Sequence, residues 1–249
     1  MVTFHKGGST YVGMLKSMKR KRVVKDLPDG TEKKSVSNLA FIGCGVAVKA
    51  LRVGFENLQL KEHTDALFTA RLMQHVHHIY NLDVDGEKGK KSILFSQHKE
   101  LLTSLNFKLG VNNVEFLQKN FSFSHADSRL EATLKLEEFQ NLFMTVQKSA
   151  DCYRIYHYLC VISDYTFSEE SQKYEALSES SGVNAVAYSE YTPLYVKLNG
   201  SIVVSLPEGT VLSDADSVIH CVGFEYYYKT RDGFEAFLGG SGIKVVEVF

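Results

Sequence analysis

The sequence has almost no excess of charge of either sign. Its 249 residues contain 28 lysines and arginines against 29 aspartates and glutamates, which gives a formal net charge of −1 and a pI near 6.8. A near-neutral molecule has no overall field that attracts a polyanion. Nucleic-acid binding would therefore be local, and positive charge is concentrated in residues 16–34, where Lys19, Arg20, Lys21 and Arg22 are the candidate contacts.

Cysteine is scarce and widely spaced. The four residues Cys44, Cys152, Cys160 and Cys221 form no C-x-x-C pair, so the sequence predicts free thiols in a reducing compartment rather than a zinc site or a disulfide scaffold. The chain also lacks a run of about 18 apolar residues and the apolar core of a signal peptide. We therefore expect a protein without a membrane span, located in the cytoplasm or within a particle.

Catalytic and metal-binding motifs are missing as well. The sequence contains no phosphate-binding loop, no nucleophile elbow and no H-E-x-x-H helix. His75 and His78 lie about one helical turn apart, but the sequence places no third ligand near them. Residues 81–92 resemble a calcium-binding loop, except that Ser92 stands where the bidentate glutamate is needed. We predict no catalytic residue, no metal and no cofactor.

The chain opens with a pattern typical of a β-hairpin. Apolar and polar residues alternate over residues 2–6, Gly7-Gly8-Ser9 supplies a turn, and residues 10–15 return. A charged connector follows and contains the turn sequence DLPDG at 26–30. Residues 1–34 form the first predicted part of the chain. Its hairpin must dock on something, because a lone hairpin is marginally stable in water.

A helical period replaces the alternation from residue 35 to residue 114. The first predicted helix begins near Ser37, and its apolar residues recur at intervals of three and four, at Leu39, Ile42, Val46, Ala50 and Val53. Gly43 and Gly45 inside it each cost about 1 kcal/mol against alanine, which indicates either close packing or a weaker helix. The second predicted helix is capped by Asp65 and has on one face Phe68, Leu72, Val76 and Ile79.

From residue 115 to residue 249 the period is two. Segments rich in β-branched and aromatic residues alternate with turn sequences, and they cover 130–136, 152–167, 195–206, 217–230, 234–238 and 243–249. Several strands at such spacing predict an antiparallel β-sandwich or barrel. The expected fold class is α+β, mainly β, with a hairpin and two helices ahead of the β-domain.

Tyrosine is concentrated in the β region, above all at Tyr226, Tyr227 and Tyr228. Neighbouring residues of a strand point to opposite sides, so Tyr227 cannot share the face of the other two. We expect one face of this strand to show aromatic rings away from the core. Such rings stack on bases or sugars in binding proteins and anchor interfaces in oligomers; a packed second sheet is the third interpretation.

Three sets of short motifs follow one another along the chain. They are Phe4, Lys6 and Tyr11; then Asn38, Phe41, Gly45, Lys49, Leu51 and Arg52; then residues 189–194 (SEYTPL) and 222–227 (VGFEYY). In these motifs the chain resembles a little-characterised family of bacterial proteins of about this length. The resemblance implies one architecture of N-terminal hairpin, helical segment and C-terminal β-domain, and it implies no known activity.

The missing catalytic motifs, the aromatic strands and a terminal hairpin that needs a partner favour a non-enzymatic structural protein. We expect it to form a homo-oligomer, as the repeating subunit of a filament, tube or shell, with a phage or viral capsid-like protein as a special case. The candidate assembly residues are Phe4, Tyr11, Tyr226, Tyr228, Val246 and Val248.

Two other functions remain as alternatives. The first is a binding module for single-stranded nucleic acid or glycan, in which exposed tyrosines act together with the basic residues 19–22. The second, a hydrolase built on Cys160 and His157, has the least support because no recognised motif surrounds these residues.

Overall fold

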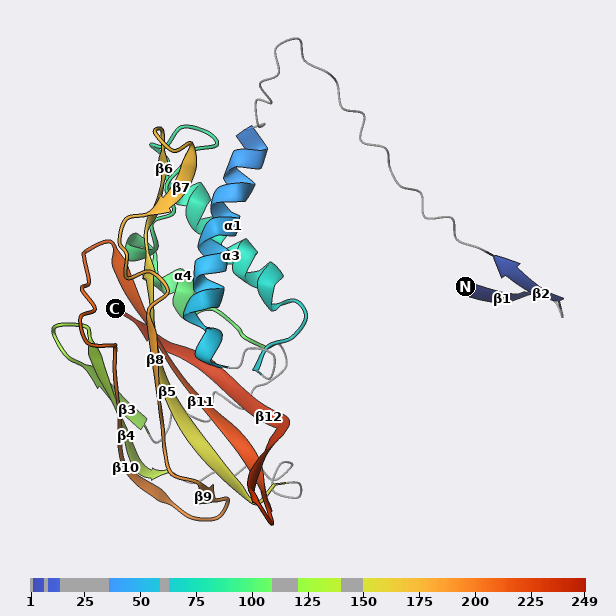
Figure 1. Cartoon of the computed structure of the whole chain (residues 1–249), viewed down its shortest axis with the longest axis vertical. Coiled ribbons are helices and arrows are strands. Elements are labelled where there is room, and N and C mark those ends of the chain that lie inside the picture. Colours follow the sequence, from blue (N-terminus) through green and yellow to red (C-terminus); the bar gives the residue numbers. More distant parts are fainter. Residues whose placement is uncertain (1, 7–8, 14–35, 59–62, 109–120, 140–149) are drawn as a thin grey trace, which may run out of the picture. The chain divides into compact units, whose positions relative to one another are not determined.

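The computed structural model describes residues 2–6, 9–13, 36–58, 63–108, 121–139 and 150–249. The chain divides into two compact units, residues 1–34 and residues 35–249. Each unit is described by itself, and Figure 1 labels their helices and strands.

The first unit contains the predicted hairpin. Strand β1 (Val2–Lys6) pairs antiparallel with β2 (Ser9–Gly13), and together they form a two-stranded sheet of their own. In this register Phe4 lies directly opposite Tyr11. The hairpin predicted from the opening alternation is therefore confirmed.

The second unit contains two antiparallel sheets and one short ribbon. The larger sheet has the order β12 (Gly233–Val248), β11 (Asp216–Thr230), β5 (Cys152–Ser163) and β8 (Asn184–Tyr188), and β9 (Thr192–Pro193) also pairs with β5. The smaller sheet has the order β10 (Leu198–Ser205), β4 (Glu131–Phe139) and β3 (Phe121–His125). The ribbon pairs β6 (Tyr165–Ser168) with β7 (Lys173–Ala176).

Strand β5 shows how the layers are built. Its alternate residues Tyr156, Tyr158 and Cys160 belong to the core beneath the helices. The odd-numbered residues of β5 face the smaller sheet. Among them, Tyr153 and Ile155 pack with side chains of β4 and β10. The larger sheet is thus a middle layer covered on both sides, with α1 and α3 on one side and β3, β4 and β10 on the other (Figure 1). The predicted class, α+β and mainly β, is confirmed.

The helical elements are α1 (Val36–Gly54), η1 (Glu56–Leu58), α3 (Phe68–Leu82), η2 (Phe95–Gln97) and α4 (Lys99–Thr103). The face predicted for α3 is confirmed, because Phe68, Leu72, Val76 and Ile79 are buried. The predicted cap is wrong: Leu67 is the N-cap residue and makes no side-chain cap hydrogen bond, and the Asp65 carboxylate accepts the Leu67 N–H at 2.9 Å ahead of the helix. None of the helices in the described ranges is long and apolar enough to cross a bilayer.

The apolar face predicted for α1 is wrong. Its members Ile42, Val46 and Val53 are 41%, 36% and 45% exposed. The buried residues are Cys44, Ala47, Val48 and Leu51. These residues are also spaced by three and four, but three of the four are small or short, so the hydropathy of the sequence favoured the other face. The face with small side chains is the buried one, because small side chains let the helix lie close to its neighbours.

Helices and strands of the second unit share one core. Residues of α1, α3 and the segment around Phe95 pack in the same cluster as Tyr158 and Ile219 of the larger sheet. Residues 35–114 and residues 115–249 therefore belong to a single compact unit, and the boundary between units lies at residue 34.

Candidate functional site

The tyrosines of the β region lie mostly inside the protein. Tyr226 is fully buried between the two sheets, and Tyr227 is buried on the helix side of β11. The prediction of a bare aromatic face on this strand is wrong for Tyr226, because the larger sheet is covered on both sides; only Tyr228, near the end of the strand, is 38% exposed. Of the other tyrosines in the β region, Tyr188 and Tyr195 are exposed.

The other predicted assembly residues have different positions. Val246 is partly buried against the cluster between the sheets, and Val248 is partly buried against the core beneath the helices. Phe4 and Tyr11 are opposed positions of the hairpin. The candidate nucleic-acid contacts Lys19, Arg20, Lys21 and Arg22 lie outside the described residues.

The geometry does not support a metal site, a calcium loop or a Cys160–His157 catalytic pair among the described residues. Among the described residues no group of three histidine, cysteine or acidic side chains is arranged to hold a metal ion. Asp83, in the calcium-like loop, accepts the backbone N–H groups of Gly86 and Ser92 at 3.0 and 2.6 Å, so its carboxylate closes the loop. Cys160 and His157 lie on opposite sides of β5 and cannot act as a pair.

A pair of buried imidazoles joins the two sheets. His157 Nε2 and His220 Nε2 are 2.5 Å apart, and both residues are inaccessible to solvent. The carbonyl oxygen of Ile202 accepts the Nδ1–H of His157 at 2.9 Å. His157 Nε2 is then the acceptor in the neutral pair and His220 donates to it, which leaves His220 Nδ1 without a hydrogen-bond partner. Glu247 Oε2 lies 3.9 Å from this nitrogen.

Burial keeps this pair neutral. Desolvation lowers the pKa of His157 to about 4 and, together with the neighbouring rings of His157 and His125, lowers the pKa of His220 to about 3. A neutral pair gives β5 and β11 a fixed hydrogen bond to each other and to β10. Sequence reasoning missed His220 because its partner lies 63 residues away in the chain.

A second buried polar cluster lies on the helix side of the larger sheet. The Glu225 carboxylate accepts a hydrogen bond from His63 Nε2 at 2.9 Å and another from the Tyr227 hydroxyl. Burial alone raises the pKa of Glu225, but these hydrogen bonds outweigh it and hold the pKa below its usual value. His63 and Glu225 are 1% and 8% exposed, so the pair is closed to bulk water and joins the segment ahead of α3 to β11.

Aromatic rings enclose a cation beside this cluster. The Arg154 guanidinium lies 4.2 Å from the ring centre of Tyr188 and 4.7 Å from that of Tyr191. Its Nε also donates to the carbonyl oxygen of Ser189 at 3.2 Å. The rings are thus occupied by a side chain of the protein, which explains part of the tyrosine excess without a ligand.

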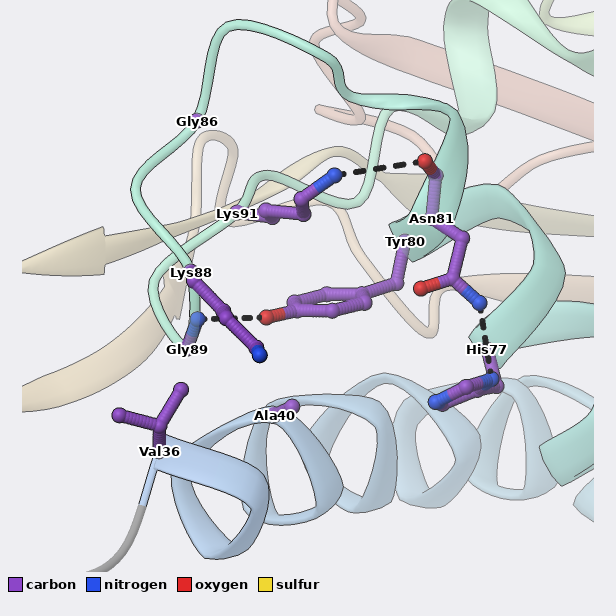
Figure 2. A pocket seen from close by; sticks show the side chains of 9 residues that line it. All are labelled: Val36, Ala40, His77, Tyr80, Asn81, Gly86, Lys88, Gly89 and Lys91. Carbon is purple, nitrogen blue, oxygen red and sulfur yellow. Dashed lines mark hydrogen bonds between the residues drawn. The ribbon is translucent and has the colours of Figure 1, made fainter.

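One pocket of about 490 Å³ opens between the first turns of α1, the end of α3 and the loop after it (Figure 2). Its polar groups include His77, Asn81 and Lys91. They are engaged with one another or with backbone: His77 Nδ1 lies 3.1 Å from Asn81 Nδ2, and Lys91 Nζ donates to the carbonyl oxygens of Asn81 and Asp83. These contacts fasten the loop to the end of α3.

The outward face of α1 is the most distinctive surface of the second unit. Phe41 is 63% exposed, and Ile42 and Val46 lie beside it. Gly45, one turn after Phe41, faces open space: a methyl group added there would meet no atom within 4 Å. Gly43 differs, because a methyl group there would lie 2.5 Å from the ring of Tyr174. Packing within the chain therefore explains Gly43 and leaves Gly45 unexplained.

Comparison with known proteins adds no further assignment. No family model, curated protein or solved structure matches this chain.

Proposed function

We propose that this protein is a non-enzymatic structural subunit that assembles with copies of itself through its N-terminal hairpin. The hairpin of one copy adds to a sheet edge of the next copy. Repetition of such a head-to-tail contact gives a filament, a tube or, if it closes, a ring or shell.

The observation that carries the proposal is the separate hairpin. It is a two-stranded sheet of five-residue strands, in a compact unit distinct from residues 35–249. Such a hairpin is marginal in water without a further partner. Phe4 and Tyr11 occupy opposed positions, and opposed positions share a face of the sheet, as does Val2 two residues before Phe4. The pair Lys6 and Ser9 lies at the turn end of the same face. Burying Val2, Phe4 and Tyr11 against a protein surface would stabilise the hairpin.

Strand β3 offers a matching acceptor edge. It is five residues long, as are both strands of the hairpin, and among the described strands it pairs with β4 alone. A strand at the edge of a sheet presents free N–H and C=O groups to an incoming strand. Phe123 on β3 is partly exposed and would pack with an added apolar face.

The test is light scattering after size exclusion, with negative-stain microscopy, on the full chain and on a chain lacking residues 1–34. We expect extended assemblies of the full chain and their loss after the deletion. The double variant Phe4→Ser with Tyr11→Ser should also abolish them. His5→Ser is the matched control. His5 follows Phe4 directly in β1 and therefore belongs to the opposite face of the hairpin. A full chain that stays monomeric or stops at dimers contradicts the proposal.

A further inference from the structure

We infer that the outward face of α1 is a second self-association surface, on which two copies pack antiparallel around a two-fold axis. The inference rests on the proposed self-assembly and adds to it a contact that the hairpin does not make. Its central feature is reciprocal: Phe41 of each copy fills the space over Gly45 of the other.

The first argument is the pair of glycines in α1. A glycine inside a helix is unfavourable by about 1 kcal/mol against alanine, so it needs a reason. Gly43 has one, because the Tyr174 ring occupies the space a methyl group would need. The hydroxyl of Tyr174 donates to the carbonyl oxygens of Gly89 and Lys91, both at 3.0 Å, so the ring is held in place. Within the described part of the second unit, Gly45 has no such neighbour: a methyl group there would meet no atom within 4 Å.

Phe41 and Gly45 give the surface of α1 a shape that can fit a second copy of itself. Phe41 and Gly45 lie one turn apart on the same side of the helix. The exposed aromatic ring projects from the helix, and Gly45, which has no side chain, leaves open space beside it for a ring of another molecule. A two-fold axis between antiparallel copies brings each ring over the other copy's glycine in the same movement, which is how an isologous interface works. Ile42, the exposed neighbour of Phe41 in the chain, then borders the contact on one side.

The first part of α1 carries no charged residue. Helix α1 carries only two charged residues, Lys49 and Arg52, both in its last two turns. Residues 36–48 offer a polyanion no positive charge to bind. An uncharged apolar face is suited to contact the same face of a second copy. In an antiparallel pair centred near residue 43, the two Lys49 residues lie about 18 Å apart along the axis, at 1.5 Å per residue. A parallel pair would hold them about 8–10 Å apart, within the range of their repulsion at physiological salt.

The two contacts have different consequences for assembly. An isologous contact at α1 closes on itself and gives a dimer. A hairpin passed to the next copy is a head-to-tail contact, which continues from copy to copy unless its rotation closes a ring. Together they cross-link chains of subunits, so a sheet or tube wall needs both contacts, while either one alone gives a simpler product.

The experiment measures association of the full chain and of the chain lacking residues 1–34, which retains the whole second unit. Sedimentation velocity at high micromolar concentration should show a monomer–dimer equilibrium for the shorter chain. Phe41→Ser should raise its dimer dissociation constant at least tenfold. Val84→Ser is the control, because Val84 is also highly exposed but lies in the loop after α3.

Gly45→Leu separates a specific contact from general stickiness. The leucine has open space and a good helix propensity, so the melting temperature of the monomer should stay equal or rise. If Phe41 fits over Gly45, the leucine blocks the hollow and the dimer is lost. If the face is merely apolar, the added side chain strengthens association, and the inference is overturned.

The remaining outcomes distinguish this inference from the proposed function. A shorter chain that is monomeric, while the full chain forms extended assemblies, overturns the α1 contact and keeps the hairpin. A full chain that stops at dimers sensitive to Phe41→Ser overturns the hairpin assembly and keeps the α1 contact. If only the shorter chain dimerises, residues 1–34 cover α1 in the intact protein, which also overturns the inference.

Discussion

The two sides of α1 are both apolar, yet they differ in what they contact. The inward side is made of Cys44, Ala47 and Leu51 and is fully buried in the core beneath the helices. The outward side carries larger side chains, including Phe41 and Ile42, and is open. Hydrophobicity alone therefore did not select the buried side; close approach to the rest of the fold did, because close packing rewards shape as well as apolar area.

The inward side should be the more sensitive of the two. Leu51→Ala removes a fully buried side chain and leaves a cavity, so we expect a loss of about 2–5 kcal/mol in the free energy of unfolding. Denaturant unfolding of the chain lacking residues 1–34 measures it. Val46→Ala on the outward side is the matched control and should change stability by less than about 0.5 kcal/mol. Equal losses for the two variants would show that the outward side is buried in solution.

Acidification should weaken the fold without affecting the outward side, since residues 36–54 contain no histidine or carboxylate. Imidazole in an unfolded chain has a pKa near 6.5, and burial lowers the pKa of His157 to about 4 and that of His220 to about 3. The unfolded chain thus binds more protons between about pH 6.5 and pH 3, and stability falls as the pH drops through this window. From pH 7 to pH 5 the expected loss is on the order of 2 kcal/mol for each imidazole.

Unfolding curves at pH 7 and pH 5 check this expectation. The window avoids Glu225, whose lowered pKa means that its contribution is present above its unfolded pKa and is lost only at more acid pH. The double variant His157→Gln with His220→Gln should be less stable at pH 7 and should lose most of the pH dependence. A wild-type stability that is the same at both pH values would contradict a neutral buried pair.

Adding a methyl group on the inward side should be destabilising. In Gly43→Ala the new carbon meets the ring of Tyr174, which its hydrogen bonds hold in place. Overpacking of this kind costs about 1–3 kcal/mol, which exceeds the gain in helix propensity of about 1 kcal/mol. A lower melting temperature is expected, and an unchanged or higher one would mean that the ring moves aside.

The same change two residues later should have the opposite sign. In Gly45→Ala the methyl group meets no atom, so the helix gains up to about 1 kcal/mol in the isolated subunit. Thermal unfolding in the Phe41→Ser background, which removes the proposed α1 contact, isolates this gain. A loss of stability there would reveal a neighbour to Gly45 within the subunit.

Elements with strong local patterns were predictable. Helix α3 followed from one apolar stripe, although its cap is not the predicted Asp65. The hairpin followed from alternation around two glycines. Helix α1 has two apolar stripes, so its periodicity fixed the helix but not its orientation. Strand β11 was expected, but its burial on both sides was not, because that depends on a second sheet whose strands lie far away in sequence.

The buried polar pairs were beyond sequence reasoning. His63 and Glu225 are separated by 162 residues, and His157 and His220 by 63. No local pattern marks either pair, since each partner is an ordinary polar residue in its own segment. The register of β5 against β11 brings His157 and His220 within hydrogen-bonding distance, with β10 packed over them. The His63–Glu225 contact depends instead on how the segment ahead of α3 packs against β11.

The sequence by itself determined the class of fold, the terminal hairpin, the helical and strand segments and the absence of recognised catalytic motifs. These features depend on local periodicity and turn residues, which act within a few residues of one another. Tertiary structure decided which side of α1 is buried, which tyrosines are exposed and which ionisable groups meet. Those outcomes depend on close packing between distant segments, and a one-dimensional pattern carries no record of the partner.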